Sequence, residues 1–310
     1  MKFVNPSVEI WEQDVTTPDT LVEAMWAHIA RCVRVCYQVD KPKNNETEEE
    51  YVRRVIFRNP DERLANHYSV LEHGAVYFSI EIPDEVSTSI TGNEIEDNKL
   101  LTIANVLWNN KFSKVKKENT QFTHIWHIST NLRVLVENDI LWALKYAVSF
   151  NPKWHESRIT VSFITNIGVT REANRHRANS PSEESTRYCN YSKKRFGRHI
   201  TYCRPSWISE GEIVDIRRDF NINCALGVYI DALHHAEQAY NSLIAYGWTP
   251  QQAREVLPLA TKSQLVHTAF ISDWYRFLKL RADGISGPPH PNMEIIAKPL
   301  KEEFINRKYI

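Results

Sequence analysis

The sequence predicts an α+β protein in which an antiparallel-leaning sheet is flanked by helices. Two stretches, 74–83 and 157–164, alternate apolar and polar residues, which is the pattern of half-buried strands. Elsewhere, and most of all in the C-terminal half, apolar residues recur at helical spacing. We therefore expect one domain over residues 1–310, with an inserted segment at about 84–156 between two strands that are neighbours in the sheet.

The N-terminal part predicts two helices. Thr17-Pro18-Asp19 supplies an N-cap, a first-turn proline and an acidic residue, and apolar side chains at helical spacing follow from Leu21 to Tyr37. A second helix is expected from about Thr47, because three glutamates stand at its positive end. In the inserted segment, apolar spacing predicts a helix over 130–148, and the tryptophans of this segment are expected in a core.

The C-terminal half predicts three helices after a short strand near 200–203. The first spans 225–246, the second begins at Thr249-Pro250, and the third spans about 263–280. The glycines and prolines of 284–291 predict a loop.

The composition excludes several classes of function. Apolar residues make up 42% and charged residues 25%, which is the balance of a globular protein. The 38 basic and 38 acidic side chains cancel, so no bulk charge favours nucleic acid or a membrane surface. The chain has neither a membrane-spanning apolar run nor a signal sequence, so a cytoplasmic protein is expected. The five cysteines form no CxxC and there is no HExxH, so no metal is expected.

A window over 174–198, NRHRANSPSEESTRYCNYSKKRFGR, gathers arginines, lysines and hydroxyls in a turn-rich stretch. Arginine donates paired hydrogen bonds to phosphate or carboxylate and keeps its charge at any working pH. The hydroxyls can donate to phosphate or ribose oxygens, whereas Glu183 and Glu184 can accept from sugar hydroxyls or a base N–H. The mixture favours a nucleotide site, but a basic, solvated loop would show the same composition.

The spacing inside this window resembles the signature of flavin-dependent thymidylate synthases. Arg175-His176-Arg177 is followed, after seven residues, by Ser185. The stretch reads RHRANSPSEESTRY where that family commonly has RHRxxSxNExSxRY.

Other stretches resemble the same family in the same order along the chain. They are Arg34-Val35-Cys36 at a helix end, H-x-[ST]-x-x-E-H from His67 to His73, A-R-x-x-L-P around Arg254, L-R-x-x at Leu280-Arg281, and H-x-x-x-E from His290. The resemblance covers most of 20–83 and 157–300, and the segment over 84–156 is additional to it.

The resemblance implies a homotetrameric enzyme that makes dTMP from dUMP. The enzyme would take a methylene group from 5,10-methylenetetrahydrofolate and a hydride from reduced FAD, and NADPH would reduce the flavin again. Its active sites would lie between subunits, with no role for nucleic acid or membranes.

The resemblance also implies the site residues. The candidate flavin residues are His67, Ser69, Glu72, Arg175, His176, Arg177 and Glu183. The candidate dUMP residues are Glu172, Arg175, Glu183, Glu184, Ser185, Arg187, Arg281 and, from a neighbouring subunit, Arg254. Two residues would be catalytic. Arg281 would face the pyrimidine and favour ionisation at N3, because a fixed cation lowers the barrier where negative charge develops. His67 would shape the path of the folate and the hydride.

Several positions depart from the family pattern. They are Glu172 in place of Gln, Ser182 in place of Asn, and Phe270 and Ser272 in place of the Asn and Arg that contact FAD. The adenine end of the cofactor would then need another partner, such as Arg276 or His267.

Two other functions stay open on the sequence. One is a nucleic-acid-binding module that uses the basic window over 171–198, although the zero net charge and the acidic residues inside the window argue against it. The other is a related flavin enzyme with a different one-carbon product.

Overall fold

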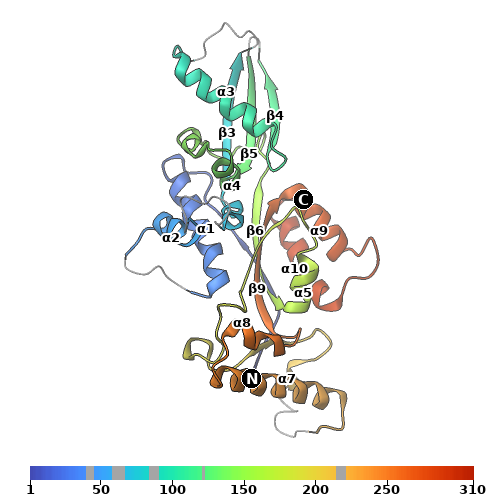
Figure 1. Cartoon of the computed structure of the whole chain (residues 1–310). Coiled ribbons are helices and arrows are strands. Elements are labelled where there is room, and N and C mark those ends of the chain that lie inside the picture. The colour runs from blue at the N-terminus through green and yellow to red at the C-terminus, as the bar shows by residue number, and fades with distance from the viewer. Residues whose placement is uncertain (40–44, 58–66, 84–90, 121–122, 214–220) are drawn as a thin grey trace.

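The computed structural model is an elongated molecule built around a central four-stranded sheet (Figure 1). It describes residues 1–39, 45–57, 67–83, 91–120, 123–213 and 221–310. The strands are β1 (Lys2–Val4), β2 (Ser7–Trp11), β3 (Ala75–Pro83), β4 (Lys114–Asn119), β5 (Thr123–Asn131), β6 (Arg158–Asn166), β7 (Ser180–Glu183), β8 (Thr201–Cys203) and β9 (Lys262–Phe270). The α-helices are α1 (Leu21–Tyr37), α2 (Glu48–Ile56), α3 (Glu94–Trp108), α4 (Leu132–Glu137), α5 (Ile167–Ala173), α7 (Ala225–Ala245), α8 (Pro250–Ala253), α9 (Ile271–Arg281) and α10 (Pro291–Asn306). Short 3₁₀ helices are η1 (Pro18–Thr20), η3 (Tyr68–His73), η4 (Leu141–Tyr146), η5 (Lys194–Phe196) and η6 (Arg254–Val256).

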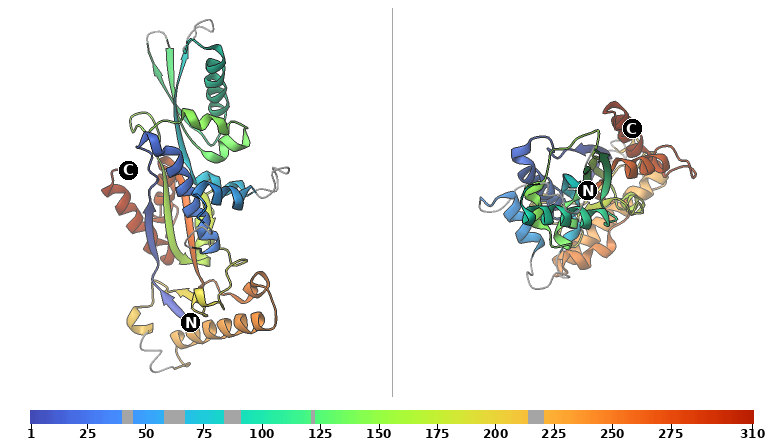
Figure 2. Two further views of the ribbon diagram at one scale, coloured as in Figure 1. Left: turned by 90° about the vertical axis from the view of Figure 1, so that its left-hand side faces the viewer. Right: turned by 90° about the horizontal axis from the view of Figure 1, so that it is seen from above.

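The central sheet has the strand order β2-β6-β9-β7, and every pair in it is antiparallel. Helices α1 and α2 lie on one side of it, and α5, α9 and α10 lie on the other (Figures 1 and 2). A parallel pair, β1 with β8, lies at the end of the molecule where α7 runs. The predicted α+β class with an antiparallel-leaning sheet is therefore confirmed.

Strand β6 was expected to be half-buried, and it is instead covered on both faces. Val161 and Phe163 face the apolar core that α9 and α10 complete. Thr160 and Ser162 on the opposite face are also buried, because α1 packs there and His28 Nε2 lies 2.8 Å from Thr160 Oγ1. The polar alternation of the sequence thus marks a buried hydrogen-bonded layer and not a solvent face.

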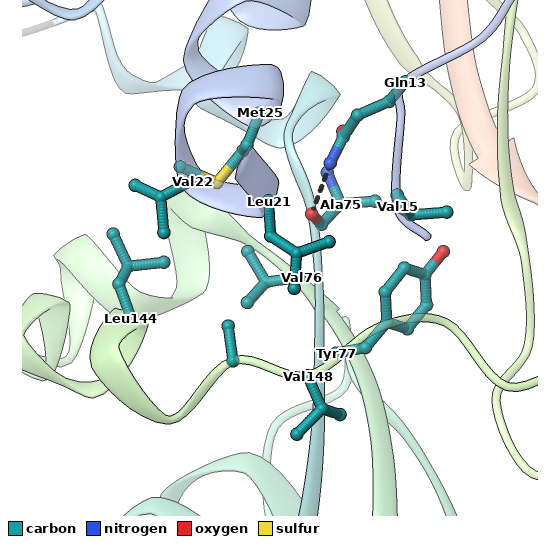
Figure 3. Close-up of a pocket in the computed structure, with 11 residues that line it drawn as sticks. Gln13, Val15, Leu21, Val22, Met25, Ala75, Val76, Tyr77, Leu144 and Val148 are labelled. Atoms are coloured by element: carbon teal, nitrogen blue, oxygen red, sulfur yellow. Dashed lines mark hydrogen bonds between the residues drawn. The ribbon is translucent and has the colours of Figure 1, made fainter. Parts of the chain in front are cut away.

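Both N-terminal helices are confirmed. Helix α1 ends where Gln38 adopts a left-handed conformation with φ of 49°. Helix α2 begins with a capping box between Thr47 and Glu50. At the seam between α1 and β3, the Gln13 side chain donates to Ala75 O at 2.8 Å and accepts from Ala75 N at 2.9 Å, beside Met25 and the other apolar residues of a small pocket (Figure 3).

The inserted segment forms a lobe at one end of the molecule, around the antiparallel sheet β3-β5-β4 (Figure 1). The segment does lie between β3 and β6 in the chain, but these two strands belong to different sheets. The expected helix over 130–148 is wrong. Asn131 ends β5 and caps the short α4, and Asp139 at φ of 60° turns the chain before η4.

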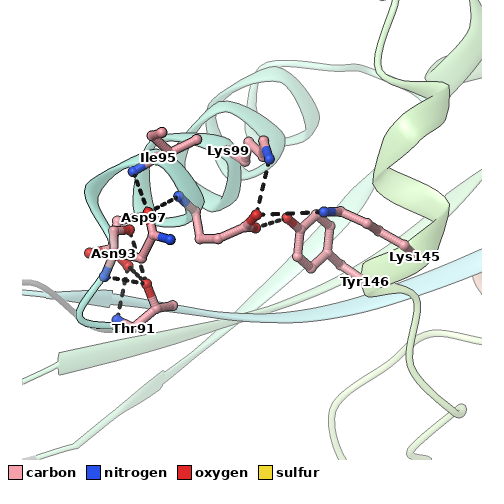
Figure 4. A network of polar contacts seen from close by, with 8 residues as sticks. Thr91, Asn93, Ile95, Asp97, Lys99, Lys145 and Tyr146 are labelled. Carbon is pink, nitrogen blue, oxygen red and sulfur yellow. Dashed lines mark hydrogen bonds and ion pairs between the residues drawn. The ribbon is translucent and has the colours of Figure 1, made fainter.

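Helix α3 of this lobe was not predicted, because the apolar periodicity of its residues is weak. Its start is fixed by the Asn93 side chain, which accepts from Ile95 N at 3.0 Å, and by Asp97, which binds Thr91 (Figure 4). Glu96 binds Tyr146 and Lys99, and the Tyr146 hydroxyl contributes most to lowering the pKa of that carboxyl.

Of Trp108, Trp126 and Trp142, which were expected in a core, only Trp126 packs against the apolar core that the described residues of the lobe form. Trp108 is 46% exposed and Trp142 is 40% exposed. Trp108 and Trp126 pack together with ring centroids 4.9 Å apart, and the Lys117 ammonium covers both rings.

The main correction in the C-terminal half concerns 263–270, which was expected to be helical. It forms the central strand β9, and the helix α9 begins only at Ile271. Helix α7 ends before Gly247 as expected, whereas the helix at Thr249-Pro250 is short and passes into η6 at Arg254. None of the described helices is long and apolar enough to cross a membrane.

Candidate functional site

The ends of α5 and α9 bring three predicted site residues together, Glu172, His176 and Arg281, here called the Arg281 group. Arg281 Nη1 lies 3.1 Å from Glu172 Oε2, and Arg281 Nη2 donates to the Glu172 carbonyl at 2.9 Å. Arg281 Nε donates to His176 Nε2 at 3.1 Å. Helix α5 is set by Asn166, whose side chain caps it at Val169 N, so the carboxylate and the guanidinium meet across two rigid elements.

The net charge of the Arg281 group depends on His176, which is neutral. Burial first and the Arg281 cation second lower the pKa of His176 to about 4. A neutral ring keeps Nε2 free of a proton, so it can accept from Arg281 while it packs on Phe277 with ring centroids 4.7 Å apart. Glu172 also lines a cavity of about 360 Å³ whose walls include Trp207 and His290. The group therefore presents a fixed cation and a carboxylate beside open space.

Two predicted carboxylates stand at the end of the edge strand β7. Glu183 accepts from Ser263 Oγ at 2.8 Å and from Asn174 Nδ2 at 3.3 Å. Glu184 is buried, where it binds Lys262 Nζ at 2.6 Å and Tyr191 OH at 3.1 Å. Because Lys262 already compensates its charge, Glu184 is held as part of a buried ion pair.

The loop after β7 meets helix α8 and η6 through two predicted arginines, and we call this contact the arginine bridge. Arg187 Nη2 donates to Gln251 Oε1 at 3.4 Å, and Arg254 Nη1 donates to Thr186 Oγ1 at 3.4 Å. Ser185 lies in the same loop, and its backbone N–H donates to Cys36 O at 3.0 Å. Both distances in the bridge are long, so the two guanidinium groups keep donors for a further acceptor.

The predicted residues of 67–72 gather on η3 at the other end of β7. His67 and Ser69 are exposed. The Glu72 carboxylate accepts from Ser180 Oγ, the first residue of β7, and pairs with Arg133 of α4 at 2.5 Å. Arg133 comes from the inserted segment and was not predicted as part of the site.

A buried chain of side chains crosses the central sheet behind η3. His28 contacts Thr160, Thr160 contacts Thr268 at 2.6 Å, Thr268 contacts His73 Nδ1 at 2.7 Å, and His73 Nε2 contacts Ser182 Oγ at 2.8 Å. Burial holds the pKa of His73 well below its usual value, so its ring is neutral and offers one donor and one acceptor. The chain ties the motif strand β7 to η3 and to the sheet.

Arg175 and Arg177 are exposed after α5, and neither has a side-chain hydrogen bond or ion pair with any described residue. Such unpaired guanidinium groups suit the diphosphate of a dinucleotide cofactor, and the exposed hydroxyl of Ser69 suits its polar edges. With these donors, Arg175, Arg177 and Ser69 are chemically suited to bind FAD.

The positions that depart from the family pattern are occupied differently than expected. Phe270 is the last residue of β9 and not part of a helix, and it is buried beneath the Arg158 and Lys114 cations. Ser272 is engaged by Lys114 and Glu156. His267 is fully buried between Asn174 and Asn179, so it cannot contact a cofactor. Arg276, on α9, is exposed.

The comparisons with known proteins bear on the half of the chain that carries most of these residues. Residues 154–306 match the family model described as thymidylate synthase complementing protein, Thy1. They form a Thy1-family domain. A search of curated proteins finds no match. Two solved structures are distantly similar, both of the UMP/dUMP methylase PolB from Streptomyces cacaoi, one bound with 5-Br UMP and one with 5-Br dUMP. Their sequence identities are 21% and 22%, their TM-scores are 0.38 and 0.36, and the match covers 48% of this chain and 69% and 67% of theirs.

The Thy1-family domain holds the Arg281 group, both carboxylates of β7 and the arginine bridge. The η3 residues lie outside it and reach it through Ser180 and Ser182. Within the described residues, no hydrogen bond or ion pair joins the Arg281 group to the arginine bridge. No cluster of three or more potential metal ligands occurs among the described residues.

Sequence reasoning missed two residues that the Thy1-family domain uses to hold its motif. Lys262, which neutralises Glu184, carries no motif signal. Arg133 lies in a segment that the family resemblance does not cover, and only its spacing to Glu137 on α4 hinted at an ion pair.

Proposed function

We propose that the protein is an FAD-dependent thymidylate synthase that converts dUMP to dTMP. In this proposal 5,10-methylenetetrahydrofolate donates the carbon and NADPH is the final reductant. The observation that supports it most is the Arg281 group inside a Thy1-family domain. A guanidinium fixed by a carboxylate and a neutral imidazole, beside a cavity, is suited to an electron-rich ring that must gain negative charge.

Arg281 would act as the fixed cation at the pyrimidine. Its three hydrogen bonds are made in advance, so little reorganisation accompanies the development of charge on the base. Glu172 Oε1 has no partner among the described residues, so it can accept from an N–H of the base. His176 keeps the guanidinium plane in place without adding a second positive charge.

The remaining residues would bind the two ligands. Ser185, Arg187 and Arg254 would hold the nucleotide, because the long contacts of the arginine bridge leave donors for a phosphate. Arg175 and Arg177 would hold the cofactor, and when bound, a reduced flavin would supply the hydride. His67 and Ser69 are exposed near Glu72 and would border the flavin and the folate.

We infer a homotetramer in which subunits complete each other's sites. The support is that the Arg281 group and the arginine bridge share no hydrogen bond or ion pair among the described residues of one chain. A second copy could place its Arg281 group against the arginine bridge of the first, with dUMP between them.

The function is tested on the purified protein. We expect a yellow protein, or one that can be loaded with FAD, which oxidises NADPH without oxygen only when dUMP and methylenetetrahydrofolate are both present. Chromatography of the product should show dTMP, and another one-carbon product would indicate the related flavin enzyme instead. A colourless protein that cannot be loaded with FAD would rule the proposal out.

A further inference from the structure

The inserted segment contacts η3 of the candidate site through the ion pair of Arg133 with Glu72. Arg133 on α4 bonds Glu137 Oε1 through Nε at 2.7 Å and Glu72 Oε1 through Nη1 at 2.5 Å. Helix α4 also touches η3 through the backbone, since Leu132 N donates to Gly74 O at 2.9 Å. The segment is therefore attached to the element that carries His67, Ser69 and Glu72.

The same element, η3, is also hydrogen-bonded to β7, the strand that carries the motif. Glu72 accepts from Ser180 Oγ, and His73 Nε2 lies 2.8 Å from Ser182 Oγ. Ser180 and Ser182 are two residues apart on β7, so they point to the same face of the strand, and both are buried. Two consecutive side chains of η3 thus hold two alternate residues of β7.

Arg133 contributes charge compensation as well as packing, because it pairs with the Glu72 carboxylate. The Glu72 side chain is only 21% exposed, and its carboxylate pairs with Arg133, while Arg158 Nη2 donates to the Glu72 carbonyl at 2.9 Å. Removing one member of a partly buried ion pair leaves the other without compensation, which costs more than the loss of an exposed pair. Without Arg133, Glu72 would turn toward water and release Ser180.

We propose that the inserted segment supplies a positioning residue, Arg133, whose ion pair with Glu72 holds η3 on β7 and sets the Glu72 carboxylate at the flavin. This rests on the proposed function as far as the flavin is concerned. The mechanical part, a link from α4 through η3 to β7, stands on the contacts alone.

The chain offers a closely matched control at the far side of the molecule. Arg307 bonds Glu303 through Nε at 2.6 Å with the same four-residue spacing, and it contacts Glu12 through Nη1. The Arg307 side chain is 35% exposed and that of Arg133 is 36% exposed. Arg133→Met and Arg307→Met therefore remove two arginines of nearly equal exposure and the same helical spacing, only one of which touches η3.

The first measurement is amide hydrogen exchange of the ligand-free protein over 180–188. Arg133→Met is expected to speed exchange in this segment by about tenfold, which corresponds to ~1.4 kcal/mol of local opening. Arg307→Met should leave it at the wild-type rate, and Arg133→Lys should restore most of the protection. Unchanged exchange in Arg133→Met, or an equal increase in Arg307→Met, overturns the proposal whether or not the protein binds flavin.

The second measurement is the affinity for FAD and the absorption spectrum of the bound flavin. Arg133→Met should weaken FAD binding about tenfold and shift the flavin bands, whereas Arg307→Met and Arg133→Lys should bind like wild type. Wild-type affinity in Arg133→Met would overturn the cofactor part. If the wild-type protein bound no FAD at all, the proposed function would fail, and the exchange result would still decide the link to β7.

Discussion

At the scale of single residues, the orientation of Arg281 is what distinguishes a site from a surface salt bridge. Its three donors have three different acceptors: a carboxylate, a carbonyl and an imidazole nitrogen. An exposed pair with one contact would contribute little and move freely. The half-buried Arg281 is fixed by two elements, and the histidine that helps to fix it stays uncharged because its pKa is about 4.

Replacing Arg281 by alanine should separate binding from chemistry. Turnover should fall by about 10²–10³, the usual loss when one preorganised electrostatic contact is removed, while FAD binding stays near wild type. The His176 pKa should rise at the same time, because one of the two causes that depress it is gone. Steady-state kinetics, flavin titration and NMR titration of the ring measure the three effects.

Arg171 on α5 provides the control, since it is exposed and has no side-chain partner among the described residues. Arg171→Ala should keep full turnover. A fully active Arg281→Ala enzyme would show that the cation has no electrostatic role in the reaction.

At the scale of elements, β7 is held mainly by buried hydroxyls and imidazoles. The chain from His28 to Ser182 crosses β6 and β9 and ends on β7, so a polar layer replaces apolar packing on that face of the sheet. Each member depends on its neighbours, because a buried donor or acceptor without a partner costs about 1–3 kcal/mol.

Thr268→Val tests this layer with almost no change in volume. The substitution removes one hydrogen-bond partner from Thr160 and one from His73, so the free energy of unfolding should fall by roughly 2–4 kcal/mol. Thr170→Val is the matched control. Thr170 is equally buried, but its hydroxyl only bonds the nearby Ile167 carbonyl. Urea unfolding measures both variants, and equal losses would mean that the chain adds nothing beyond ordinary hydroxyl burial.

At the scale of the whole molecule, stability should depend on pH through histidines that fold in the neutral form. Burial is the main cause that lowers the pKa of His28 to about 4 and that of His267 to about 3. In the unfolded chain both titrate near 6.5, so the unfolded state binds more protons below that pH. Stability is therefore complete above about pH 6.5 and is lost as the pH falls toward 4.

The contribution of one histidine can be isolated by substitution. Each group with a depressed pKa should lower the free energy of unfolding by ~1.4 kcal/mol per pH unit between about pH 6 and pH 5. His28→Gln should reduce that slope by about this amount, and His235→Gln, which removes an exposed histidine on α7, should not change it. Urea unfolding at several pH values gives the slopes. A wild-type slope in His28→Gln would contradict the assignment.

The sequence predicted the elements whose sequence patterns are local. The prediction failed for strand β9, which is buried on both faces and therefore lacks an alternation of apolar and polar residues. Helix α1 and strand β3 carry clear periodicity, and α2 begins with three glutamates at its positive end, so all three were found. Strand β9 is buried on both faces, so its apolar residues do not alternate, and a run of this kind cannot be told from a helix by periodicity.

The same limit applies to the site. The spacing of Arg175, His176 and Ser185 pointed to the motif, and matching two distant segments to one family assigned Arg281 and His176 to one site. Their direct hydrogen bond was not predicted. The partner of Glu72 could not be found this way, because Arg133 lies in a segment with no counterpart in that resemblance. The single-domain boundary over 1–310 and the roles given to the site residues stay predictions.

The position of β7 at the rim of the central sheet restricts how copies of the protein can meet. Glu184 N points toward β9, so the outward positions on this strand are those of Pro181 and Glu183. Proline has no amide hydrogen to offer and glutamate adds charge, which are two means by which natural sheets prevent uncontrolled extension. The strand that carries the motif is thus a poor template for aggregation, and a second subunit of the proposed tetramer would have to approach it through side chains.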